Sequence, residues 1–185
     1  MNVQTRIVEA RDPSLFTSDE FDRMVEIGAF EDMRAELVAG RIERMAPADG
    51  GHGSSHFTVA FRLGRAFAEL PVHIAVDLSV RIDAYTTRGI DIAVALQPFA
   101  RRRGTPVGEL LLGVEIADTT LGRDLVAKSE EYALAGLPHY WVVDLNSGTV
   151  YVMSEPGDDG YSQREVVRFG EPLAVPGTNA SITVD

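Results

Sequence analysis

Residues 90–96 have the sequence IDIAVAL, and residues 110–116 have the sequence LLLGVEI. Both segments are short and apolar on both faces, which is typical of central strands covered by helices on each side of a sheet. Each segment also contains one acidic residue, Asp91 in the first and Glu115 in the second. The two segments therefore predict the middle of a sheet that holds two carboxylates.

Other strand patterns surround these two segments. Residues 72–82, VHIAVDLSVRI, alternate apolar with mostly polar or small residues, so we expect a strand whose apolar side chains, from Val72 to Ile82, all lie on one face. Residues 34–45 predict two short strands joined at Ala39-Gly40. Four later segments predict a hairpin and two edge strands: 140–145, 149–153, 161–169 and 181–185.

Three helices are predicted between these strands. The first begins at Thr17, where Thr-Ser-Asp-Glu has the form of a capping box, and ends at Gly28. The second runs from about Ser55 to Glu69, and the third from Asp124 to Ala135. The order of elements favours an α/β (α+β) fold with a mixed central sheet, helices on its flanks and extra hairpin strands.

The length of 185 residues suits one domain over residues 1–185, with residues 1–16 as a loose arm. No apolar run approaches the roughly 20 residues that cross a bilayer, so we expect no membrane partner. The chain has no cysteine, which excludes disulfides and thiolate metal sites. With no signal-peptide pattern near the start, a cytoplasmic location is the expectation.

The charge balance bears on the choice of partner. Acidic residues outnumber basic ones by 28 to 17, which gives a net charge of −11. Proteins that bind nucleic acid usually present a basic face that neutralises phosphates. Either the basic residues of this chain gather on one face, or its partner is not a long nucleic acid.

Asp91 and Glu115 are the first candidates for a functional site. A carboxylate in a buried strand costs several kcal/mol unless it is paired or binds a metal ion. Magnesium prefers such oxygen ligands, and one or two carboxylates suffice to hold it. Glu36 in the segment RAELVAG is a third candidate. The structural alternative is that each acid points to solvent at a strand end or caps a neighbouring helix.

Lys128 is the fourth candidate, on the predicted helix 124–135. It lies four residues after Asp124 and three before Glu131, so one interpretation is a solvent-exposed ion pair on the helix surface. It also lies at the margin of the apolar stripe and could reach the sheet. There its ammonium group would orient an attacking water or stabilise charge on a phosphate.

Four segments carry a family resemblance: AELVAGRIERMAP, GIDIAVA, GVEIADTTLGRD and KSEEYALAGLPHYWVVD. In this order they resemble the Uma-type putative restriction-endonuclease family, a bacterial family of the PD-(D/E)XK nuclease superfamily. The resemblance runs from about Arg34 to Met153, and it is most specific from Lys128 to Asp144. It implies a restriction-endonuclease-like fold.

The resemblance also implies roles for single residues. Asp91 and Glu115 would be metal-binding acids, with Glu36 as a further ligand. Lys128 matches the lysine that the family places on the helix after the third core strand. The wider superfamily has its lysine two positions after the glutamate, where this chain has Ala117. Asp124 matches a family position and is expected to orient Lys128.

Some positions depart from the family pattern or match it only weakly. Ile90 replaces the proline that usually precedes the first acid, and Asp118 lies in a stretch that is usually serine-proline. His56 matches a histidine common in the family and is expected to cap a helix or approach the site. A zinc pair of His52 and His56 is disfavoured because Gly53 lies between them.

These observations favour a metal-dependent endonuclease that hydrolyses phosphodiester bonds in DNA. Mg²⁺ is the expected cofactor, with Mn²⁺ as a possible substitute. A homodimer is expected because nucleases of this fold often cut two strands as pairs. The alternative, which the acidic balance favours, is a non-catalytic nuclease-fold module that binds a partner or assembles as an oligomer.

Overall fold

The computed structural model of the chain describes residues 14–45, 50–99 and 103–185. Most of the expected N-terminal arm, residues 1–13, lies outside these ranges. The end of the arm contacts the first hairpin, since the amide of Phe16 donates to the carbonyl of Gly40 at 2.8 Å.

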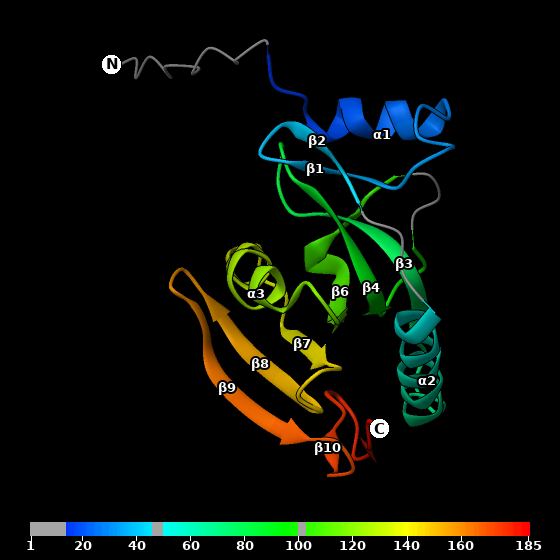
Figure 1. Ribbon diagram of the computed structural model, residues 1–185, viewed down its shortest axis with the longest axis vertical. Coiled ribbons are helices and arrows are strands. Elements are labelled where there is room, and N and C mark those ends of the chain that lie inside the picture. The colour runs from blue at the N-terminus through cyan, green and yellow to red at the C-terminus, as the bar shows by residue number, and fades with distance from the viewer. Residues whose placement is uncertain (1–13, 46–49, 100–102) are drawn as a thin grey trace, which may run out of the picture.

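The predicted mixed sheet flanked by helices is confirmed (Figure 1). The helical elements are α1 (Ser18–Glu26), α2 (Gly50–Ala66), the short 3-10 helix η1 (Val107–Glu109), α3 (Leu121–Arg123), the π-helical segment η2 (Asp124–Lys128) and α4 (Ser129–Leu134). The strands are β1 (Ala35–Val38), β2 (Arg41–Arg44), β3 (His73–Arg81), β4 (Thr87–Ala95), β5 (Thr105–Pro106), β6 (Leu110–Ala117), β7 (His139–Asp144), β8 (Thr149–Gly157), β9 (Gly160–Arg168), β10 (Leu173–Ala174) and β11 (Ser181–Ile182).

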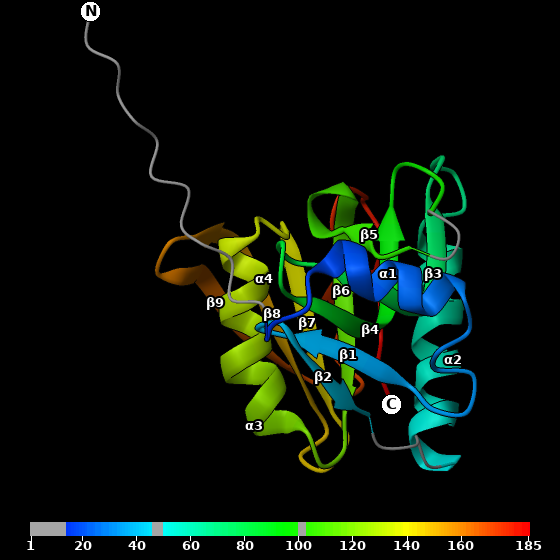
Figure 2. The ribbon, with the colours of Figure 1, turned by 90° about the horizontal axis from the view of Figure 1, so that it is seen from above.

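The main sheet has the order β2-β1-β4-β6-β7-β8-β9, with β3 paired to β4, and β5 paired to β3. Strands β6 and β7 are parallel and are joined by the continuous helical run from α3 through η2 to α4. Figure 2 shows this run on one face of the sheet and α2 on the other. The two predicted central strands, β4 and β6, therefore lie between helices.

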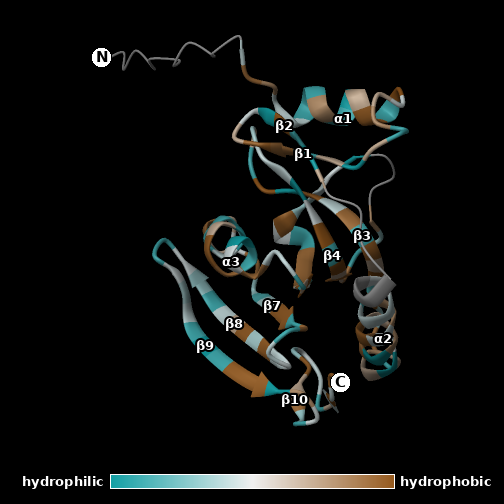
Figure 3. Cartoon of the chain, in the orientation of Figure 1, coloured by the Kyte–Doolittle hydropathy of each residue, from teal (hydrophilic) through white to brown (hydrophobic). Residues whose placement is uncertain are grey.

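The core divides into two clusters, one on each face of the sheet. The α2-side cluster includes Val59, Leu63, Phe67, Ile92, Val94, Leu112, Val114, Ile116 and Trp141. The α4-side cluster includes Val80, Ile90, Ala93, Ala95, Ala117, Tyr132, Ala133, Tyr140 and Val142. Figure 3 shows hydrophobic residues concentrated on β4, β6 and β7, while much of β9 is hydrophilic.

The predicted local signals at the first helix and the first hairpin are confirmed. Thr17 Oγ1 accepts from the amide of Glu20 at 3.3 Å, and Glu20 Oε2 accepts from the amide of Thr17 at 2.9 Å, which completes the capping box. Ala39 and Gly40 join β1 to β2 with φ angles of 47° and 78°. Both lie in the left-handed region that a type I′ hairpin turn requires.

The prediction that the apolar residues of segment 72–82 share one face was wrong. Ile74 packs against the α2-side cluster, whereas Leu78 packs against the α4-side cluster. Asp77 between them has a φ of 53°, which interrupts the regular alternation of the strand. The paired strand β4 changes faces at the same level, because Ile90 belongs to the α4-side cluster and Ile92 to the α2-side cluster.

The second helix begins earlier than expected, at Gly50 instead of Ser55. Gly53 therefore lies inside a continuous helix, although the side chain of His52 is outside the described residues. None of the helices in the described ranges is long and apolar enough to cross a membrane.

Candidate functional site

The site lies where strand β4 changes its pairing partner. On the edge of β4 away from β3, Thr87 pairs with Leu37 of β1, and residues 92–95 pair with β6. Residues 88–91, called the gap segment below, lie between these two partners. The gap segment is therefore the part of β4 where side chains can bond to the backbone in place of a neighbouring strand.

Glu36 and Lys128 both bond to Gly89 in the gap segment. The amide of Gly89 donates to Glu36 Oε1 at 2.8 Å, and Lys128 Nζ donates to the carbonyl of Gly89 at 3.0 Å. Glu36 belongs to β1, whereas Lys128 ends the π-helical segment η2. The gap thus brings together two residues that are far apart in the chain.

Asp91 bridges the gap segment to β6. Its Oδ2 accepts from the amide of Ile116 at 2.7 Å, and Ile116 lies two residues beyond the last main-chain pair, Ile92 with Val114. Glu115 precedes Ile116 and lies next to Asp91 across this opening. The two acids predicted from the sequence therefore lie on facing residues of β4 and β6, where these strands part.

Lys128 reaches Glu115 from the helical layer. Lys128 Nζ lies 2.8 Å from Glu115 Oε1, and both side chains are nearly fully buried. The hydroxyl of Tyr132 donates to the same oxygen at 3.4 Å. The interpretation of Lys128 as a solvent-exposed helix residue was wrong, because only 1% of its side chain is exposed. Widened π-helical turns such as η2 are frequent at functional sites.

Asp124 lies on the same helical run, and its Oδ1 is 3.9 Å from Lys128 Nζ. Thr120 Oγ1 donates to its Oδ2, and the hydroxyl of Tyr140 donates to its carbonyl at 3.1 Å. Its buried Oδ1 accepts no hydrogen bond from the residues that the structure describes. Asp124 therefore lies beside Lys128, and its charge helps to raise the pKa of the ammonium group.

Arg88 is a site residue that the sequence analysis missed. It is 4% exposed and donates to Glu36 Oε2 at 3.2 Å and to both carboxylate oxygens of Glu131 at 2.6 and 2.8 Å. Burial alone would lower the pKa of the Arg88 guanidinium, but hydrogen bonding with Glu131 and the charges of both acids outweigh burial and raise it. Arg88 therefore stays charged. Together with the Gly89 amide, it gives each carboxylate oxygen of Glu36 a hydrogen bond.

The site contains more acids than cations. Three buried carboxyls, of Glu36, Glu115 and Asp124, and two partly buried ones, of Asp91 and Glu131, accompany two buried cations, Lys128 and Arg88. Burial raises the pKa of Glu115 well above its ordinary value; the Lys128 charge opposes this rise, and the Asp91 and Asp124 charges add to it. Burial lowers the pKa of Lys128, but the charges of Glu115, Glu36 and Asp124 outweigh this and raise it.

The donor set fits a divalent cation. The excess of carboxyls over cations favours a bound cation beside the acids. Glu115 uses Oε1 for Lys128 and Tyr132, so Oε2 is its oxygen for an ion. Asp91 uses Oδ2 for the Ile116 amide, which fixes the direction of its carboxylate.

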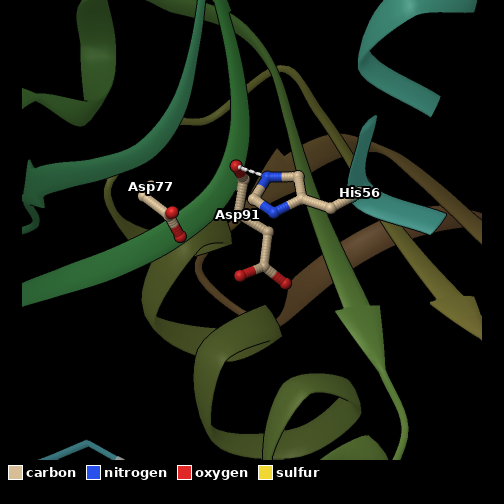
Figure 4. A group of neighbouring side chains, drawn as sticks. All are labelled: His56, Asp77 and Asp91. Carbon is tan, nitrogen blue, oxygen red and sulfur yellow. Dashed lines mark hydrogen bonds between the residues drawn. The ribbon is translucent and has the colours of Figure 1, made fainter. Parts of the chain in front are cut away.

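A second group of possible ligands lies on the other side of Asp91. His56, Asp77 and Asp91 each offer one ligand atom, and these three atoms all lie within 4.8 Å of one another (Figure 4). His56 comes from α2, and its Nε2 bonds to the carbonyl of Asp91. Asp77 was not among the predicted site residues. In the structure Val76 pairs with Ile92, and Leu78 with Ile90, which places Asp77 opposite Asp91.

Asp118, the acid that departs from the family pattern, contacts the β7–β8 turn. Its carbonyl and its Oδ1 both accept from Asn146 Nδ2. Asp144 is buried at the end of β7 and accepts from the amide of Asn146 at 3.0 Å. These acids therefore order the turn.

Comparison with known proteins gives two matches of interest. The family model Uma2, described as putative restriction endonuclease, matches residues 18–185. The crystal structure of a putative nuclease belonging to DUF820 from Anabaena variabilis ATCC 29413 is similar in fold, with a TM-score of 0.70 and 18% identity over 91% of this chain and 95% of that chain. No curated protein matches. With this fold and a family match over nearly its whole length, the chain belongs to the Uma2 family of putative restriction endonucleases.

Proposed function

We propose that the protein is a metal-dependent endonuclease that hydrolyses phosphodiester bonds in DNA. The observation that supports the proposal is that Asp91 and Glu115 face each other on β4 and β6 where these strands part, with Lys128 bonded to Glu115. Two carboxylates beside an ammonium group are the set that metal-assisted phosphodiester hydrolysis uses. The family of putative restriction endonucleases adds the substrate class.

Asp91 and Glu115 would hold Mg²⁺, with Mn²⁺ as a substitute. A bound divalent ion would supply Lewis-acid stabilisation of charge on the phosphate and lower the pKa of a bound water. The sequence also predicts Glu36 as a ligand. Because both of its oxygens bond to Arg88 and Gly89, the proposal gives Glu36 the role of positioning the gap segment.

Lys128 would act on the substrate directly. An ammonium group has three donors. One goes to the carbonyl of Gly89 and one to Glu115 Oε1, so the third can orient a water or bind a phosphate oxygen. Asp124 keeps Lys128 in place and charged. The expected homodimer, which would bring two sites to the two strands of a duplex, belongs to the same proposal.

Nicking of supercoiled plasmid DNA tests the proposal. We expect nicking with Mg²⁺ or Mn²⁺ and none with a chelator, and a loss of at least about a hundredfold in Asp91→Asn and in Lys128→Met. Glu130→Gln is the matched control, because Glu130 is exposed on the same helical run and should keep full activity.

The proposal would be contradicted if the folded wild-type protein left plasmid DNA intact with both Mg²⁺ and Mn²⁺, and if Asp91→Asn behaved in the same way. Tight, metal-independent binding of a partner in that case would favour the non-catalytic module instead.

A further inference from the structure

Asp91 lies between two groups of side chains. Glu115 and Lys128 lie towards β6, whereas His56 and Asp77 lie on the side of α2 and β3. The proposed function uses only the first group. We infer that His56, Asp77 and Asp91 form a second cation site, which takes a divalent transition ion such as Mn²⁺ or Zn²⁺ in preference to Mg²⁺.

The ligand atoms are close enough for one ion after a side-chain adjustment. The three atoms lie within 4.8 Å of one another. Ligands of a tetrahedral ion lie about 3.4 Å apart when each bond is about 2.1 Å, so ion binding would draw the three atoms together by up to about 1.4 Å. Three protein ligands with open positions for water or substrate are the arrangement of catalytic metal sites.

The orientation of His56 supports the site independently. Its Nε2 bonds to the carbonyl of Asp91, and a carbonyl can only accept, so Nε2 carries the proton. In the neutral ring the lone pair is then on Nδ1, and Figure 4 shows this nitrogen on the side of the Asp91 carboxylate. A histidine that ligates a metal commonly donates its other N–H to a backbone carbonyl in this way.

Asp77 provides the route from solvent. Half of its side chain is exposed, and its Oδ1 lies 2.7 Å from Arg34 Nη2, whose side chain is also exposed. Exposed ion pairs of this kind contribute little, so an entering cation can displace Arg34. The imidazole ligand makes the site prefer a transition ion to Mg²⁺, because nitrogen donors favour transition ions, whereas Mg²⁺ favours oxygen donors.

The inference deepens the proposed function, on which it rests through the shared residue Asp91. Two cations that share a carboxylate are the arrangement of two-metal phosphodiesterases, in which the ions lie about 3.5–4 Å apart. Asp91 is the only one of these acids that belongs to both groups of ligands, so we expect it to be the bridge.

Binding of Mn²⁺ without DNA tests the second site. We expect calorimetry on the metal-free full chain to give two Mn²⁺ ions per chain, and electron spin echo spectroscopy to show coupling to an imidazole nitrogen. His56→Gln should abolish the nitrogen coupling, and Asp77→Asn should weaken the second site at least about tenfold. His73→Gln and Asp158→Asn, at exposed positions, are the matched controls and should change neither.

Glu115→Gln separates this inference from the proposed function. It should remove the first ion and keep both the second ion and the nitrogen coupling, even if the protein leaves DNA intact. Asp77 is half exposed and Asn has nearly the same shape, so this variant tests the site even if His56→Gln does not fold. A single Mn²⁺ without nitrogen coupling, or a Mn²⁺ affinity unchanged by Asp77→Asn, would overturn the inference.

Discussion

Lys128 Nζ and Glu115 Oε1 lie 2.8 Å apart, although one residue ends a π-helical segment and the other belongs to a central strand. Both side chains are at least 96% buried. A buried ion pair adds little net stability when it is complete, but removal of one partner leaves an uncompensated charge in the core. The pair therefore makes the site and the fold depend on each other.

Lys128→Met should lower the free energy of unfolding by about 3–5 kcal/mol, because it leaves the buried Glu115 without its cation. Urea unfolding with a chelator present measures this. The double variant Lys128→Met/Glu115→Gln should recover part of the loss, since the stranded acid is removed. A loss of less than about 1 kcal/mol in Lys128→Met would show that the pair is not coupled to the fold.

Arg88→Met should cost a similar amount, about 3–5 kcal/mol, because Glu36 is left buried without its partner. Arg88→Lys should recover only part of this, since an ammonium group cannot match both oxygens of Glu131. Arg103→Ala breaks an exposed pair with Glu26 and should change stability by no more than about 0.5 kcal/mol. Equal losses in the Arg88 and Arg103 variants, measured by urea unfolding, would contradict this assignment.

Stability without metal should fall with rising pH because of Glu115. The folded pKa of Glu115 is raised above its ordinary value of 4.5, so its contribution is fully present below about pH 4.5 and is lost as pH rises through the folded pKa. Unfolding of wild type and Glu115→Gln between about pH 4.5 and pH 8 measures the effect. The variant should gain stability relative to wild type as pH rises, and a difference that stays constant would refute the assignment.

Ala39→Asn should stabilise the protein by about 0.5–1 kcal/mol, because Ala39 has a φ of 47° and asparagine tolerates that region better than alanine. The urea midpoint should rise with an unchanged slope. Ala68→Asn, at an exposed position without a positive φ, is the control and should bring no gain. A lower midpoint in Ala39→Asn would mean that contacts of the methyl group outweigh the backbone preference.

The central strands were predictable because two covered strands require apolar residues on both faces, and β4 and β6 satisfy this. Asp91 and Glu115 were predictable as site candidates because a carboxylate in such a strand needs a charged partner or a metal ion. Lys128 was ambiguous from spacing alone, since the same spacing suits an exposed helix surface. The family resemblance favoured a position of Lys128 in the site, and the contact of Lys128 with Glu115 agrees with this.

Two features could not be predicted from local patterns. Arg88 lies 52 residues from Glu36 and 43 from Glu131, so its pairing depends on how the hairpin β1–β2 and α4 dock on β4. The change of faces in β3 depends on the φ of Asp77, which an alternating sequence does not reveal. Both are tertiary effects that override the local period.

The simultaneous change of faces in β3 and β4 has a consequence for where acidic side chains lie in the sheet. Asp77 and Asp91 lie opposite each other at this level, between Ile90 of the α4-side cluster and Ile92 of the α2-side cluster. The change of faces therefore places the two acids where the regular alternation of both strands is interrupted. Because β4 pairs with β3 on one edge and with β6 on the other, this single interruption places Asp91 between acids of both neighbouring strands, Asp77 and Glu115.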